Sequence, residues 1–318
     1  MSPSQAMATV ALGSTGLQVT PVCIGCAALG SNPGLFGYEV GLERALATLR
    51  RAFQGPLNFL DTSNNYGGGD SERRIGMVLS DLGGLPDGFV LASKVDPDPV
   101  SGAFDGARTR RSFEESLSRL GLDHLQLLYL HDPSRISFEE AMSPGGAVEA
   151  LVALRDEGLV SHIGVAEGGA RLLERYMGTG AFDVILSHNR YTLLDRSAGD
   201  VIAAGFERGL GVVNAAVFGG GVLAKGIYEQ PKYAYRALSP DARGRILEME
   251  SVCAEAGVPL KAAALQFSLR EPRVASTVVG VSRPERVDEI LELASVPVPE
   301  ATWARLEELA LPRQQWLY

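Results

Sequence analysis

Polar residues at the ends of apolar, strand-sized segments are the feature that most constrains the fold of this chain. Asp61, Lys94 and His131 each end such a segment, and they lie 33 and 37 residues apart. This spacing is the length of one strand followed by one helix. Because parallel strands of one sheet end at the same edge, we expect the three side chains to be neighbours there. In a barrel of alternating strands and helices, that edge carries the active site.

Eight segments have the composition of buried strands, and segments with helical spacing of apolar residues separate them. Before them, a Gly-bearing turn at residues 13–16 joins two short alternating segments and predicts a β-hairpin. Strands that are apolar on both faces and are each followed by a helix favour a closed parallel barrel. We therefore expect an α/β fold, a (β/α)8 TIM barrel with an N-terminal β-hairpin, as a single domain over residues 1–318. The expected strands are 22–25, 57–61, 89–94, 125–131, 161–165, 182–187, 211–215 and 275–280.

A doubly wound dinucleotide-binding fold is the main alternative, and the sequence argues against it. The first strand leads into the hexapeptide 25–30, Gly-Cys-Ala-Ala-Leu-Gly, which lacks the Gly-x-Gly-x-x-Gly pattern. The longest irregular stretch, residues 226–240, carries three tyrosines. Inside a barrel, a loop of this length predicts a lid over the site.

Composition narrows the class of protein. The net charge of −9 argues against a nucleic-acid or anionic-membrane surface. The apolar runs are too short to span a bilayer as a helix, and the N-terminus lacks the pattern of a secretory signal. Three cysteines fit a reducing compartment, so we expect a cytoplasmic protein. We interpret Cys23 and Cys26 as small buried residues of the first strand, and we expect no metal site.

The side chains at the sheet edge suit proton transfer. Tyr66 lies in the loop five residues after Asp61. A free tyrosine has a pKa of about 10, and we expect the ammonium of Lys94 to lower that pKa. Asp61 can supply the counter-charge that keeps Lys94 protonated, and His131 can donate a hydrogen bond to a substrate oxygen. The set fits proton transfer at an oxygen coupled to hydride transfer at its carbon.

Two kinds of hydrolase are not favoured by the sequence. The Gly-x-Ser-x-Gly turn that exposes a nucleophilic serine is absent. We expect Asp61 to be the only acidic residue at the strand ends, so that the paired carboxylates of a glycosidase are not evident.

Several of these residues occur in the order typical of the aldo-keto reductase superfamily, which the chain resembles over nearly its whole length. The matching positions are the hairpin 12–19, Gly25, the run 59–67 (Phe-Leu-Asp-Thr-Ser-Asn-Asn-Tyr-Gly), Lys94 and the pair 130–131 (Leu-His). The resemblance implies a barrel enzyme that reduces carbonyls or oxidises alcohols with a nicotinamide cofactor, NAD or NADP. It implies a catalytic tetrad of Asp61, Tyr66, Lys94 and His131, with Tyr66 as the general acid/base.

The same resemblance implies the cofactor contacts. They are expected at strand ends, in the glycine-rich loop after the seventh strand, and in the last strand–helix loop. The residues are Gly25, Cys26, Asp61, His188, Phe218, Gly219, Gly220, Gly221, Leu223, Gly280, Arg286 and Glu289. The glycines at 219–221 permit close approach of a pyrophosphate to backbone N–H groups.

The chain departs from the family pattern at positions that concern the cofactor. Ala166, Glu167 and His188 stand where the family holds the nicotinamide amide with Ser, Asn and Gln. Gly280 replaces a lysine that is common in NADP-preferring members. Arg286 and Glu289 are kept, and at i, i+3 on a helix they can pair. We expect dual use of NAD and NADP, with a lean to NAD.

Within the superfamily, the chain resembles the branch of aldose 1-dehydrogenases that act on D-threo-aldoses, L-fucose or L-galactose. The segments that carry this likeness are 129–133, 213–223 and 258–267. It implies oxidation of the anomeric hydroxyl of an aldose to a lactone. The alternatives are a general NADPH-dependent aldehyde or ketone reductase and a cofactor-binding regulatory subunit like those of potassium channels. The expected partner is a small-molecule sugar or carbonyl substrate, with no nucleic acid and no membrane, for a monomer or weak homo-oligomer.

Overall fold

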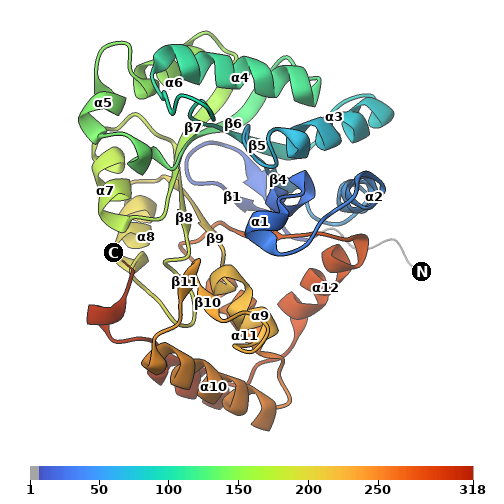
Figure 1. Ribbon diagram of the computed structural model, residues 1–318, viewed down its shortest axis with the longest axis vertical. Coiled ribbons are helices and arrows are strands. Elements are labelled where there is room, and N and C mark those ends of the chain that lie inside the picture. Colours follow the sequence, from blue (N-terminus) through green and yellow to red (C-terminus); the bar gives the residue numbers. More distant parts are fainter. Residues whose placement is uncertain (1–6, 318) are drawn as a thin grey trace.

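The expected parallel strands close into a barrel in the computed structural model, which describes residues 7–317. Neighbouring strands follow the order β12-β3-β4-β5-β6-β7-β8-β9, and β9 pairs with β12 to close the ring. Figure 1 shows the strands surrounded by helices, with α4 and α6 side by side at the top. The barrel strands are β3 (Val22–Gly25), β4 (Phe59–Asp61), β5 (Val90–Val95), β6 (Leu125–His131), β7 (Val160–Glu167), β8 (Val184–His188), β9 (Gly211–Ala215) and β12 (Ser276–Gly280).

Helices follow the barrel strands and bury their apolar faces against them. In the helix after β3, for example, Ala45 and Leu49 are fully buried while Arg50 is exposed. The principal helices are α2 (Leu42–Phe53), α3 (Asp70–Leu82), α4 (Gly106–Leu120), α6 (Ala147–Asp156), α7 (Ala170–Gly178), α8 (Gly199–Glu207), α11 (Leu260–Leu269) and α12 (Pro284–Ser295). The shorter or additional helices are η1 (Ala27–Gly30), α1 (Pro33–Phe36), η2 (Pro133–Arg135), α5 (Phe138–Met142), η3 (Gly219–Gly221), α9 (Val222–Lys225), α10 (Pro240–Glu255), α13 (Glu300–Glu308) and η4 (Arg313–Gln315).

The expected N-terminal hairpin, β1 (Val10–Ala11) and β2 (Gln18–Val19), closes the floor of the barrel. Leu12 and Val19 are fully buried and belong to the same apolar cluster as the inward-facing Phe59 and Tyr129. The backbone N–H of Ser14 donates to the carbonyl just before β9, at 2.8 Å. Because this end is plugged, the opposite rim, where the strands end, is the face open to ligands.

The segment 226–240, expected to be an irregular loop, contains regular secondary structure. Residues 232–237 form a small antiparallel hairpin of β10 (Lys232–Tyr233) and β11 (Arg236–Ala237). Tyr233 is buried and its hydroxyl is 2.8 Å from that of Thr192, so the hairpin is anchored to the loop after β8. Within residues 7–317, no helix has both the length and the apolar composition to cross a membrane.

Candidate active site

A buried ion pair joins the ends of two adjacent barrel strands. The Nζ atom of Lys94, on β5, donates to Oδ1 of Asp61, on β4, at 2.5 Å, and to the backbone carbonyl of Thr62 at 2.7 Å. The Lys94 and Asp61 side chains are only 2% and 5% exposed. Charges this deeply buried are tolerated because each has a charged partner within hydrogen-bond reach.

Tyr66 and His131 complete the convergence that the spacing predicts. The Nζ atom of Lys94 lies 3.3 Å from the Tyr66 hydroxyl. The rings of Tyr66 and His131 meet edge to face, with their centroids 5.7 Å apart. The structure therefore brings together a carboxylate, an ammonium, a phenol and an imidazole at the rim where β4, β5 and β6 end.

The loop after β4 holds Tyr66 through a close backbone contact. Gly67 has a φ of 62°, and a Cβ added there would lie 2.0 Å from the carbonyl oxygen of Gly30. A Cβ added at Gly30 would in turn meet the backbone of Tyr66 at 2.6 Å. The carbonyl of Tyr66 also accepts a hydrogen bond from the Ser71 N–H, at 3.2 Å, in the first turn of α3. The phenol is thus fixed by backbone packing as well as by Lys94.

The protonation states of Lys94 and Tyr66 are coupled. Burial lowers the pKa of Lys94, but the neighbouring Asp61 carboxylate and Tyr66 oxygen outweigh it, so the pKa lies above its ordinary value. Burial also raises the pKa of the Tyr66 phenol, and the attraction of Lys94 offsets only part of that rise. The expectation that Lys94 would bring the Tyr66 pKa below its ordinary value is therefore wrong for the protein alone, in which Tyr66 keeps its proton at neutral pH.

His131 is oriented by Asp96, a residue that we did not single out in the sequence. Nδ1 of His131 donates to Oδ1 of Asp96 at 2.7 Å, while the other oxygen of Asp96 accepts the N–H of Asn65 at 3.0 Å. Burial lowers the pKa of His131, but the Asp96 charge outweighs it and the pKa is raised. Because Nδ1 is occupied, Nε2 is the nitrogen available to a substrate. The sequence did contain a signal for Asp96. It lies two residues after Lys94, and side chains two residues apart in an extended strand point to the same side.

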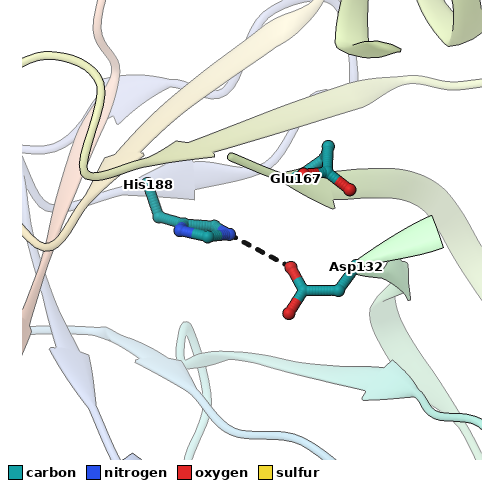
Figure 2. Close-up of side chains that lie close together, drawn as sticks. All are labelled: Asp132, Glu167 and His188. Carbon is teal, nitrogen blue, oxygen red and sulfur yellow. Dashed lines mark hydrogen bonds and ion pairs between the residues drawn. The ribbon is translucent and has the colours of Figure 1, made fainter. Parts of the chain in front are cut away.

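Carboxylates at the strand ends are more numerous than we expected, so the view of Asp61 as the only acidic residue there is wrong. Asp96 follows β5, Asp132 follows β6, and Glu167 is the last residue of β7. Figure 2 shows Asp132 and Glu167 beside His188, with one Asp132 oxygen 3.1 Å from Nε2 of His188. His188, expected at the nicotinamide, is therefore already engaged by the side chain of Asp132, the residue that follows β6.

The strand order places the expected cofactor residues along one part of the rim. Gly280 of β12 pairs with Gly25 of β3, and Gly25 pairs with Asp61 of β4. Phe218 lies in the loop after β9, the other neighbour of β12, as the N-cap of η3. The side chains of Cys26 and Leu223 are fully buried beneath this surface.

The glycine-rich loop after β9 is a tight turn built on three consecutive glycines with positive φ. Gly219, Gly220 and Gly221 have φ angles of 57°, 75° and 104°, a conformation that residues with a Cβ rarely adopt. A Cβ at Gly219 would lie 2.3 Å from the Tyr233 ring, so the loop also packs against the β10–β11 hairpin. The N–H groups of Gly219 and Gly221 donate to the carbonyls of Ala216 and Phe218, at 2.9 and 3.0 Å, so these two amides hold the turn itself.

A basic cluster lies at the start of α12, beyond Gly280. Arg286 Nη1 donates to Glu289 Oε2 at 2.8 Å, the i, i+3 pair expected from the sequence. Lys261, from the start of α11, also donates to Glu289, and Arg283 lies 3.6 Å from it. Nothing in the sequence pointed to Lys261, because only the packing of α11 against α12 brings it there. The glycine turn and these cations therefore lie on the part of the rim where the sequence predicts the cofactor contacts.

Comparisons with known proteins agree with this geometry. The model of the aldo/keto reductase family matches residues 21–311. D-threo-aldose 1-dehydrogenase of a Pseudomonas species is 33% identical, over 95% of this chain and 97% of its own. L-galactose dehydrogenase of Arabidopsis thaliana is 32% identical, over 95% of this chain and 94% of its own. The holo form of an aldo-keto reductase from Bacillus halodurans has the same fold, with a TM-score of 0.78 and 21% identity over 96% and 97% of the chains.

The backbone contact at Gly67 leads to a test with a matched pair of variants. Gly67→Ala must displace the loop that carries Tyr66, because the new Cβ meets the Gly30 carbonyl. Gly68→Ala has nearly the same φ but meets nothing within 4 Å, so it carries only the conformational cost of about 1–2 kcal/mol. We expect Gly67→Ala to lower Tm and turnover strongly and Gly68→Ala to lower Tm slightly with turnover retained. Equal turnover and equal Tm in the two variants would show that the Gly30–Gly67 contact does not position Tyr66.

Proposed function

The chain belongs to the aldo/keto reductase family and is an NAD(P)-dependent oxidoreductase, and on that premise we propose that it oxidises the anomeric hydroxyl of an aldose to a lactone. The whole chain then acts as one catalytic domain. The observation that carries the proposal is the contact of the Tyr66 hydroxyl with Lys94 beside the free Nε2 side of His131. Relatives over nearly the full length of the chain carry names of aldose and galactose dehydrogenases.

In this proposal the tetrad handles the proton of the substrate hydroxyl. The substrate oxygen sits between His131 and the Tyr66 oxygen, which accepts the proton. Nδ1 of His131 already donates to Asp96, so Nε2 donates to the substrate oxygen only while the ring is protonated on both nitrogens, the form that the raised pKa of His131 favours. Lys94, held charged by Asp61, stabilises negative charge on Tyr66 as the proton moves. When bound, the nicotinamide supplies the hydride acceptor at the substrate carbon.

The cofactor is held, in this proposal, along the rim from β9 to β4. The glycine loop 219–221 takes the pyrophosphate, and the cluster around Glu289 takes the adenosine end. Gly25 and Gly280 lie between them, where the backbones of β3 and β12 pair closely.

A second candidate is reduction of aldehydes or ketones by the same site, and one observation favours it. Because burial raises the pKa of Tyr66, the phenol keeps the proton that a reductase must donate. A panel of aldoses with NAD, run against a panel of simple aldehydes with NADPH, separates the two candidates. Turnover of aldehydes without turnover of any aldose would overturn the dehydrogenase proposal.

The raised pKa of Tyr66 sets the expected pH dependence of oxidation. The reactive form is the phenolate, whose population at neutral pH is small because the pKa is raised and which grows as pH rises. We expect kcat for aldose oxidation to climb as the pH rises above neutral, until His131 loses its proton and with it the donor at Nε2. Tyr66→Phe should lower kcat by about 10²- to 10⁴-fold and leave cofactor Kd nearly unchanged.

Steady-state kinetics across pH and a fluorescence titration of cofactor measure these two quantities. Tyr228→Phe is the matched control, since Tyr228 is 83% exposed. Oxidation that keeps its rate and its pH dependence in Tyr66→Phe would remove Tyr66 from the proton path.

We also propose dual use of NAD and NADP with a lean to NAD, because the cations near Gly280 are partly neutralised. Glu289 already accepts from Arg286 and Lys261, and its own charge opposes a 2′-phosphate. We expect Glu289→Gln to tighten NADP by about tenfold relative to NAD, or roughly 1.4 kcal/mol. Glu292→Gln, exposed on the same helix, should change neither affinity.

Intrinsic fluorescence titrated with each cofactor measures both affinities. If the unmodified protein bound NADP more than about a hundredfold tighter than NAD, nearly 3 kcal/mol, the lean to NAD would be wrong.

A further inference from the structure

Asp132, directly after His131, is held in a strained backbone conformation. Its φ of 43° and ψ of 56° lie in the left-handed region, which costs a residue with a Cβ about 1–2 kcal/mol. The following Pro133 further disfavours a helical conformation at this position. The backbone N–H of Asp132 donates to the carbonyl of Ala166 at 2.8 Å, which fixes the turn. Strain of this kind concentrates at functional sites, where it aims a side chain.

The turn aims the carboxylate of Asp132 at the reaction site. Its Oδ1 accepts from Nε2 of His188 at 3.1 Å, as Figure 2 shows, while Oδ2 lies 4.0 Å from Nε2 of His131. The nitrogen that faces Oδ2 is the one left free by the His131–Asp96 hydrogen bond. At 4.0 Å the Asp132 and His131 atoms do not hydrogen-bond to each other. A substrate oxygen bound to His131 therefore has Asp132 as its immediate neighbour.

Asp132, Glu167 and His188 form one cluster, and of its two carboxylates only that of Asp132 has an oxygen that faces the expected position of the substrate. Both oxygens of Glu167 accept backbone N–H groups, from Ser134 at 3.1 Å and Gly169 at 2.9 Å, so Glu167 braces the loops. Burial raises the pKa of Asp132, but the hydrogen bond from His188 and the charge of His131 outweigh it and the pKa is well below its ordinary value. The Asp132 side chain, 30% exposed, is thus an ionised acceptor that a ligand can reach.

The turn of the β10–β11 hairpin carries an exposed aromatic side chain, Tyr235, which is 58% exposed. The hairpin packs on the glycine loop after β9, where a Cβ at Gly219 would lie 2.3 Å from the Tyr233 ring. A rim that offers an ionised acceptor and an exposed ring suits a ligand with both hydroxyl donors and C–H surface. Polyhydroxylated carbonyl compounds have both hydroxyl donors and C–H surface, whereas simple aldehydes have only C–H surface.

We infer that Asp132 is a specificity-determining residue that accepts a hydrogen bond from the hydroxyl on the carbon next to the reacting one. The site thereby selects α-hydroxylated substrates, such as aldoses, over their deoxy counterparts. The inference rests on the proposed function, since it places the reacting oxygen on His131. A site built to bond a substrate hydroxyl discriminates against the analogue that lacks it, because the bound analogue displaces water from the carboxylate and offers it no donor in return.

The test compares two substrate pairs that differ by this hydroxyl, in the unmodified protein and in Asp132→Ala. The oxidation pair is L-galactose and 2-deoxy-L-galactose with NAD. The reduction pair is glyceraldehyde and propionaldehyde with NADPH. We expect the unmodified protein to favour the α-hydroxylated member in kcat/KM by about 10- to 100-fold or more. Asp132→Ala should lower that preference to within about threefold, by a loss on the hydroxylated member alone.

Two further variants complete the design. Asp132→Asn keeps an uncharged oxygen acceptor and should retain an intermediate preference. Asp87→Ala, an exposed aspartate before β5 at the opposite end of the barrel, should leave both pairs unchanged.

Three outcomes would overturn the inference: no preference in the unmodified protein, an equal loss on both members of a pair in Asp132→Ala, or a loss confined to cofactor Kd. The reduction pair separates this inference from the proposed function. If L-galactose and the other aldoses gave no turnover, the proposed oxidation would fail, while glyceraldehyde against propionaldehyde would still decide the role of Asp132.

Discussion

The buried pair of Lys94 and Asp61 is the interaction on which the rest of the site depends. Two charges that are almost fully removed from water are tolerable only while they are paired, so the ends of β4 and β5 must lie in this register. The pair also fixes the ammonium beside the Tyr66 hydroxyl. Removing either partner would leave an uncompensated buried charge, which costs about 3–5 kcal/mol. The stability of the barrel rim and the position of the ammonium beside Tyr66 therefore both depend on the contact between Lys94 and Asp61.

The pattern of this pair is repeated around the rim. Each of three carboxylates at a strand end bonds a nitrogen from another strand: Asp61 with Lys94, Asp96 with His131, and Asp132 with His188. The first pair keeps a cation beside the phenol, the second orients the imidazole, and the third, we infer, aims an acceptor at the substrate. A row of such pairs gives a rigid polar surface above an apolar barrel interior.

The sequence predicted the barrel and the convergence of four side chains because both follow from the strand–helix period, which is local. It also predicted the Arg286–Glu289 pair, an i, i+3 contact within one helix. It could not predict the raised pKa of Tyr66, since burial of the phenol depends on how the loop after β4 packs against η1. Lys261 was missed for a similar reason: its partner Glu289 lies on another helix. Asp96 and Asp132 were within reach of sequence reasoning, because both follow a residue already identified at a strand end.

In the proposed reaction, hydride leaves the anomeric carbon of an aldose while Tyr66 takes the hydroxyl proton. An aldose deuterated at that carbon, incubated with the protein and NAD, tests this most directly, with mass spectrometry of the reduced nicotinamide and of the product. We expect one deuterium atom in the nicotinamide for each lactone formed. Reduced nicotinamide without deuterium, or an aldose that is not consumed while simple aldehydes are reduced, would contradict the proposed reaction.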